Sequence, residues 1–225
     1  MPEGMRRMPR HSHPRSPGPL LRGDAISRAC LGGIALAAVM VTVRSVHAAS
    51  AGPQPAMTGV PALGAEAAEG TCVACHTSFP LNADSAGSIA IEGVPATYEP
   101  GRAYTLTVRV SHTDATALRW GFQMTAVAMK DGSGAGEFIA TDAATTQVIA
   151  AMSGSRSYVE HSYGGTAIGQ AGGNSWTFEW KAPATDVGRV GFFAAGNVAN
   201  ADGSNQGDRV YSRSPLPIAE SQAGG

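Results

Sequence analysis

Apolar and polar residues alternate along several short segments of this chain, and this two-residue period limits what it can fold into. Residues 104–110, 120–126 and 176–180 each place an apolar side chain at every second position. Such alternation is typical of β-strands that bury one face. Gly, Asp, Asn and Ser residues separate the segments, as turns between strands require. The sequence therefore predicts an all-β domain.

Other segments with a less regular apolar pattern are expected to add strands to the predicted sheets. No stretch after residue 70 has a helical period, and 29 Gly and 14 Pro among 225 residues agree with many turns. About eight or nine strands at this spacing predict an immunoglobulin-like antiparallel β-sandwich over residues 87–214. We expect the other strands at 88–94, 137–141, 147–152, 158–163 and 208–212, with a central one at the apolar run 188–195. We expect the core to contain Trp120, Phe122, Trp176, Phe178, Trp180, Phe192 and Phe193.

The first 49 residues differ in charge from the rest, with a net +5 against −6 for residues 50–225. An apolar run of fourteen residues, 30–43, follows the basic start and precedes Val46-His47-Ala48, a small-residue cleavage site. The run is shorter than a membrane span needs, and the layout is that of a secretory signal peptide. We expect export to the periplasm or the cell exterior, with Cys30 removed. An uncleaved N-terminal anchor is the alternative.

Two further segments flank the predicted sandwich. Residues 50–70 are rich in Ala, Gly and Pro without a period, which predicts a flexible linker. Residues 215–225 are polar and predict a tail, so we expect no membrane span in the mature chain. The acidic mature part and a pI near 6.6 exclude a basic nucleic-acid binder.

One motif carries chemistry: Cys72-Val73-Ala74-Cys75-His76 is the C-x-x-C-H pattern of c-type haem attachment. On a short helical turn, two thiols separated by two residues can reach both vinyl groups of one haem. The following histidine then lies under the porphyrin with a ring nitrogen on the iron. The segment 71–86 is therefore predicted to hold one covalent haem c, with His76 as proximal iron ligand. A disulfide or free dithiol, and half of a zinc site, remain as alternative interpretations.

The sixth iron ligand is less restricted by the sequence, because the distal face of such a haem can stay open or take His or Met. His161 shares a predicted strand face with apolar Val159 and is our first candidate, and His112 is the second. Four methionines are also available: Met57, Met124, Met129 and Met152. Ligation by two histidines favours electron transfer over oxygen chemistry, because no position is left for a substrate.

Several stretches resemble a known family. They are CVACHTSFPLN with GSIAIEGVPATYEPGRAYTLTVRV, RWGFQMTAV with SRSYVEHSYGG, and WTFEWKAP with VGFFAAGNVANADGSNQGDRVYS. From about residue 71 to 214 the chain is similar to the bacterial Reeler-type (reelin-like) domain proteins, also grouped as choice-of-anchor V domains. The resemblance implies an extracellular or periplasmic β-sandwich led by a CxxCH, and it marks His161 as a haem ligand or site residue. Many such proteins end in a C-terminal anchor, and the polar end of this chain departs from that pattern.

The motif and the export signal together predict an exported mono-haem c-type electron carrier rather than an enzyme. Its partners would be periplasmic or surface redox proteins, and an acidic surface favours basic ones. The alternative is an extracellular binding or adhesion module without haem, using loops such as 197–208. A haem enzyme or gas sensor with an open distal site is a third hypothesis. No G-x-S-x-G, P-loop or HExxH motif is present.

Overall fold

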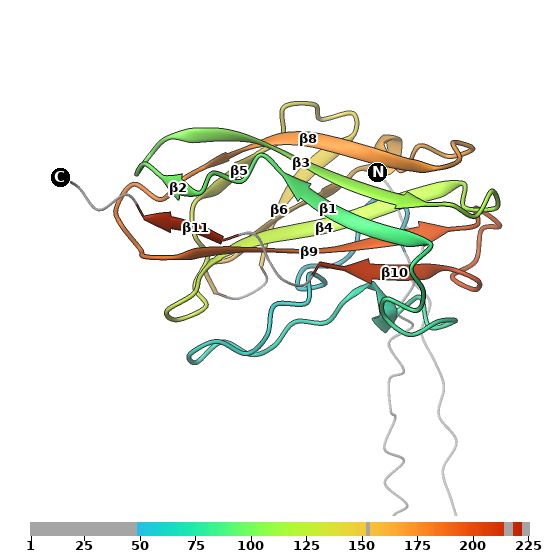
Figure 1. The fold of residues 1–225 in the computed structure, drawn as a ribbon, viewed down its shortest axis with the longest axis horizontal. Helices are drawn as coiled ribbons and strands as arrows, with labels where there is room; N and C mark the ends of the chain where they lie inside the picture. The colour runs from blue at the N-terminus through green and yellow to red at the C-terminus, as the bar shows by residue number, and fades with distance from the viewer. Residues whose placement is uncertain (1–48, 152–153, 214–217, 222–225) are drawn as a thin grey trace, which may run out of the picture. The chain divides into compact units, whose positions relative to one another are not determined.

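The computed structural model describes residues 49–151, 154–213 and 218–221, and every structural statement below concerns these residues. Two β-sheets face each other (Figure 1). The smaller sheet has the order β1 (Gly87–Glu92), β3 (Ala103–His112), β8 (Gly173–Lys181), β5 (Glu137–Ile139). The larger has the order β2 (Thr97–Tyr98), β11 (Ile218–Ser221), β9 (Val190–Ala199), β4 (Arg119–Ala128), β7 (Ser157–His161), β6 (Thr146–Ala150), and β10 (Arg209–Ser212) also pairs with β9. The predicted all-β sandwich is confirmed.

Each of the nine predicted segments contains a strand, and β9 is central in its sheet as expected. The strands β2 and β11 were not predicted, because β2 has only two residues and β11 lies in a segment whose composition is polar. β11 lies within 215–225, where the sequence predicted only a polar tail. It pairs antiparallel with β9 and parallel with β2, so the larger sheet is mixed rather than purely antiparallel.

The core between the sheets is aromatic, as the alternation predicts. Three tryptophans from β4 and β8 are at most 2% exposed. Each indole N–H donates to a backbone carbonyl: Trp120 to Gln170 at 2.8 Å, Trp176 to Gly165 at 2.8 Å and Trp180 to Ala135 at 2.9 Å. Large apolar rings are thereby buried without leaving a polar group unsatisfied.

Phe193, by contrast, lies outside the space between the sheets. It packs with Val127 and Val60 in a second apolar cluster on the outer face of β4 and β9. Val60 belongs to residues 50–70, which the sequence predicted as a flexible linker. The structure instead places this segment against the larger sheet, and this explains why both faces of β4 and β9 are buried.

Side chains of the sheet also hold the same segment. The backbone N–H of Met57 donates to Gln123 Oε1 at 2.7 Å, and Gln123 Nε2 donates to the carbonyl of Gln54 at 3.0 Å. Further along, the buried carboxylate of Glu69 pairs with Arg156 Nη1 at 2.6 Å. The segment forms only isolated β-bridges, Thr58–Thr71 and Leu63–Glu66, and no strand, so it has no strand period.

Residues 1–48 of the predicted signal peptide, Cys30 among them, lie outside the described residues. Within the described residues, no helix has both the length and the apolar character that crossing a membrane requires.

Candidate functional site

The C-x-x-C-H motif forms a single tight turn, with η1 (Cys72–Ala74) as a 3-10 helix. The backbone N–H groups of Cys75 and His76 both donate to the carbonyl of Cys72, at 3.1 and 2.9 Å. The turn thus gathers both thiols and the imidazole, as the haem motif predicts. The two sulfurs are not bonded to each other and are partly buried. Burial raises the pKa of the Cys72 thiol to about 12 and raises that of Cys75 as well.

A cavity of about 920 Å³ adjoins this turn, and Cys72, Cys75 and His76 all line it. The volume is within the range of small-molecule and cofactor pockets. Trp120 and Val198 belong to the core between the sheets, so the alternating residues Gly121 and Asn197 face outward. The cavity therefore lies on the outer face of the larger sheet, and residues of the segment 49–57 also line it.

His76 is oriented by a buried carboxylate. Its Nδ1 lies 2.6 Å from Oδ2 of Asp208, which is 1% exposed. A buried carboxylate accepts the Nδ1 proton and leaves the lone pair on Nε2, the arrangement that metal-binding histidines use. The amide of Asn197 lies beside the ring, with Nδ2 3.3 Å from Nδ1 and 3.5 Å from Nε2.

His161 also lines the cavity, although 85 residues separate it from His76 in the chain. The pairing of β4 with β7 ends at Gln123–Glu160. Beyond this pair, the His161 side chain rather than its backbone contacts the backbone of Phe122 in β4. Its Nδ1 lies 3.1 Å from both the N and the O atoms of Phe122. Nδ1 either accepts from the N–H of Phe122 or donates to its carbonyl, and in the second tautomer Nε2 keeps its lone pair.

The charge and the position of His161 are both set by its surroundings. The side chain is 7% exposed, and burial lowers its pKa to about 4, with smaller contributions from the charges of Arg119 and His76. The ring is neutral at physiological pH as a result. A glycine underlies it: a Cβ on Gly121 would lie 2.8 Å from His161 Cε1. Only a residue without a side chain lets the imidazole approach the strand so closely.

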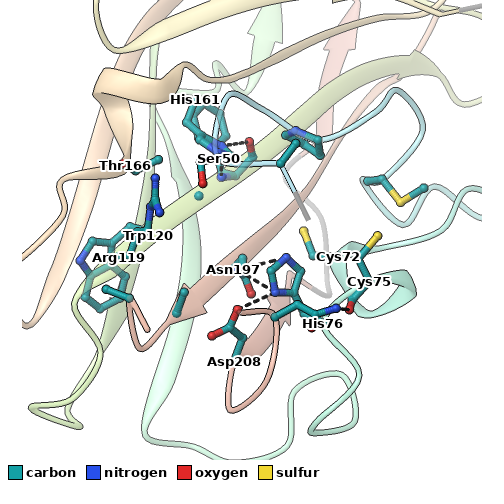
Figure 2. Close-up of a pocket in the computed structure, with 18 of the residues that line it drawn as sticks. Ser50, Cys72, Cys75, His76, Arg119, Trp120, His161, Thr166, Asn197 and Asp208 are labelled. Carbon is teal, nitrogen blue, oxygen red and sulfur yellow. Dashed lines mark hydrogen bonds and ion pairs between the residues drawn. The ribbon is translucent and has the colours of Figure 1, made fainter. Parts of the chain in front are cut away.

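The labelled side chains surround the cavity (Figure 2). His161 lies on one side and His76 on the opposite side, the two cysteine sulfurs lie along one flank, and Arg119 lies toward the other. The turn and the first-choice distal histidine, predicted separately from the sequence, are thus brought to one space.

The other distal candidates differ in their positions. His112 does not line the cavity; its Nδ1 accepts the backbone N–H of Asp114 at 2.9 Å, and its Nε2 lies 3.7 Å from Asp84. Met124 is buried between the sheets, and Met129 packs against the outer apolar cluster. Met57 does line the cavity, and Met152 lies outside the described residues.

Sequence reasoning gave Arg119, Asn197 and Asp208 no role at the haem site. Asn197 and Asp208 were included only in the loop 197–208 of the haem-free binding module, because nothing local shows that Asp208 lies against a histidine. The only sequence signal was the AAGNVANADGS stretch, which contains Asn197 and carries part of the family resemblance.

The residues present fit a covalently attached haem. Two thiols on one turn, an oriented histidine and a second neutral histidine share a cavity of suitable volume. In addition, Asn197 Oδ1 is buried at this site without a hydrogen-bond partner among the described residues. Such an orphaned acceptor is typical of a site that is completed by a ligand or water.

Comparison with known proteins supplies the family. The model of the Reeler domain matches residues 73–200, more than half of the chain. The chain belongs to the Reeler family. This Reeler match includes Cys75, His76 and His161, whereas Cys72 and Asp208 lie outside it. Reeler membership supports an extracellular module.

Among solved structures, the chain is similar to the human F-spondin reeler domain, with 25% identity over 61% of this chain and 90% of that one, and a TM-score of 0.40. It is also similar to the Reelin-N domain of F-spondin, with 21% identity over 67% and 97%, and a TM-score of 0.42. No curated protein matches the chain.

Proposed function

We propose that this Reeler protein is an exported mono-haem c-type cytochrome that carries single electrons. The observation that supports the proposal is the single cavity that unites the C-x-x-C-H turn with His161. Cys72 and Cys75 would hold one haem c as thioethers, and His76 and His161 would be its axial ligands. When bound, haem supplies a one-electron ferric–ferrous couple.

The chain's own residues determine how that couple is used. Asp208 accepts the Nδ1 proton of His76, which would leave Nε2 free to hold the iron and would raise the basicity of this histidine. A neutral His161 would be the second histidine to hold the iron, and ligation by two histidines favours electron transfer over reaction with dioxygen or a substrate. Met57 adds an apolar residue to the lining. This arrangement favours a carrier over an enzyme.

The partners would be redox proteins of the periplasm or the cell surface. One electron would pass from a reduced donor to this protein and then to an oxidised acceptor. The net charge of −6 on residues 50–225 favours basic partners through long-range attraction. Export would depend on the predicted signal peptide, 1–49.

Intact mass and a visible spectrum test the proposal. The full chain, expressed for export together with a haem-attachment system, should gain the mass of one haem and stay red after acid–acetone extraction. The double variant Cys72→Ala/Cys75→Ala is the control and should release its colour. Wild-type protein without the added mass would contradict the proposal.

Spectra of single variants test the axial ligand. His161→Ala should convert a low-spin haem to high-spin, whereas His112→Ala, which removes a buried histidine away from the cavity, should leave the spectrum low-spin. An unchanged His161→Ala spectrum with a changed Met57→Ala spectrum would assign the sixth ligand to Met57 instead. A carbon monoxide shift in the wild type would indicate an open distal site, as in the enzyme or sensor hypothesis.

Membership of an extracellular family favours one alternative, a binding or adhesion module without haem. The cavity would then take another ligand, and Cys72 and Cys75 would form a disulfide or half of a metal site. A folded, exported and colourless wild-type protein would support this alternative.

A further inference from the structure

The guanidinium of Arg119 lies on the side of the cavity away from the cysteines. The proposed function gives this residue no role. Arg119 is the first residue of β4, and it is the only Lys or Arg among the residues that line the cavity. Within the described residues, its side chain has no carboxylate within ion-pair distance. The side chain is half-buried.

The position of Arg119 is supported by an aromatic ring. Its guanidinium carbon lies 5.7 Å from the ring centroid of Tyr163, in η2 (Tyr163–Thr166). Tyr163 is 68% exposed, so the pair lies toward solvent.

The charges that line the cavity are unbalanced around this group. Asp208 is the only carboxylate among the lining residues, and it is already paired with His76. A partly desolvated cation without a partner is costly, and an anion in the cavity would offset that cost. Arginine suits a carboxylate in particular, because its planar fork can donate two parallel hydrogen bonds.

The arrangement of the side chains around the cavity indicates which anion would pair with Arg119. A porphyrin of the b or c type carries its two vinyl groups on one part of its rim and two propionate carboxylates on the opposite part. The cysteines that would capture the vinyl groups and Arg119 lie on opposite flanks of the cavity, with His161 and His76 on the remaining two sides (Figure 2).

We propose that Arg119 binds a propionate carboxylate of the haem and thereby sets the orientation of the porphyrin. This inference rests on the proposed function, since it requires the haem. It adds the residue that would recognise the acidic edge of the cofactor, which the C-x-x-C-H motif leaves unassigned. The pair would also keep that propionate ionised and neutralised across the physiological pH range.

The test is the midpoint potential of Arg119→Gln as a function of pH. Removing the cation leaves an uncompensated propionate charge beside the iron, which disfavours the reduced form. We expect the equilibrium to shift about tenfold toward the oxidised form at pH 8, about 59 mV for one electron, and less at pH 5 where the free propionate gains a proton. Arg102→Gln removes the same charge from an exposed pair with Glu99 and should leave the potential unchanged.

Each outcome has a separate meaning. Arg119→Gln with haem attached by mass, but with the wild-type potential at every pH, would overturn this inference and leave the proposed function intact. Wild-type protein without haem would overturn the proposed function and this inference with it. If Arg119→Gln does not fold, Arg119→Lys keeps the charge but not the fork. A shift in its haem-methyl resonances would support the contact, and unchanged resonances would contradict it.

Discussion

His76 and Asp208 lie 132 positions apart in the chain, yet their side chains meet at 2.6 Å in a part-buried pair. At the scale of single residues, this contact matters most for the proposed chemistry. Removing the negative charge would make His76 a weaker donor to the iron, and a weaker donor favours the reduced form.

Asp208→Asn should therefore raise the midpoint potential. The amide keeps the shape of the side chain, so we expect a shift of about tenfold toward the reduced form, about 59 mV, with haem still attached. Potentiometric titration measures it. Asp202→Asn, in the exposed part of the same loop, is the control. Equal potentials for both variants would contradict the role of Asp208.

The lowered pKa of His161 should make the stability of the haem-free double variant Cys72→Ala/Cys75→Ala depend on pH. This pKa is about 4 in the folded chain and about 6.5 when unfolded, so between these values the unfolded state binds more protons. Stability should be fully present above pH 6.5 and fall by about 3 kcal/mol as the pH drops through this window to 4. Urea unfolding measures it. With His161→Gln added, this part of the pH dependence should disappear; an unchanged curve would contradict the assignment.

At the scale of elements, the segment 50–70 forms part of the cavity, because Ser50, Pro53, Gln54 and Met57 line it. It covers the outer face of β4 and β9 through Val60, and the backbone of residues 54–57 bonds to Gln123 at the edge of the cavity. Glu69 fastens the far end of the segment. Its Oε1 accepts from Arg156 and from the hydroxyl of Tyr158, and both charged side chains are buried.

Glu69→Ala should be strongly destabilising, because it leaves the buried Arg156 guanidinium without its anion. Loss of one partner of a buried pair typically costs about 3–5 kcal/mol. Glu99→Ala breaks an exposed pair with Arg102 and should cost less than about 1 kcal/mol. Chemical denaturation of both variants compares them. Similar small costs would mean that Glu69 does not fasten the segment.

At the scale of the whole molecule, the β-sandwich is a scaffold, and the candidate haem site lies on the outer face of its larger sheet. The core between the sheets fills with aromatic rings, and the cavity forms where three distant parts of the chain meet on the outer face of the larger sheet. These parts are residues 49–76, 119–166 and 197–208. The acidic charge of residues 50–225 belongs to this scale too, because it acts on partners at a distance.

Electron exchange with a basic redox protein should slow as salt is added. Attraction between opposite net charges accelerates encounter at low ionic strength and is screened as the Debye length shortens. We expect the bimolecular rate, measured by stopped flow, to fall roughly tenfold between low and high salt. An acidic redox partner is the control and should show no such fall. A salt-independent rate with the basic partner would contradict electrostatic steering.

The sequence by itself determined the features that neighbouring residues encode. The two-residue period predicted three strands, and shorter or continuously apolar segments between turn residues predicted six more, because both patterns are local properties of the chain. The apolar positions also predicted the aromatic core, apart from Phe193. The C-x-x-C-H spacing predicted a turn that gathers Cys72, Cys75 and His76. Only the tertiary structure decided which distant residues join them. Placing His161, Asp208 and Arg119 around that turn, and residues 50–70 over the sheet, depends on packing between segments far apart in the chain, for which no local pattern exists.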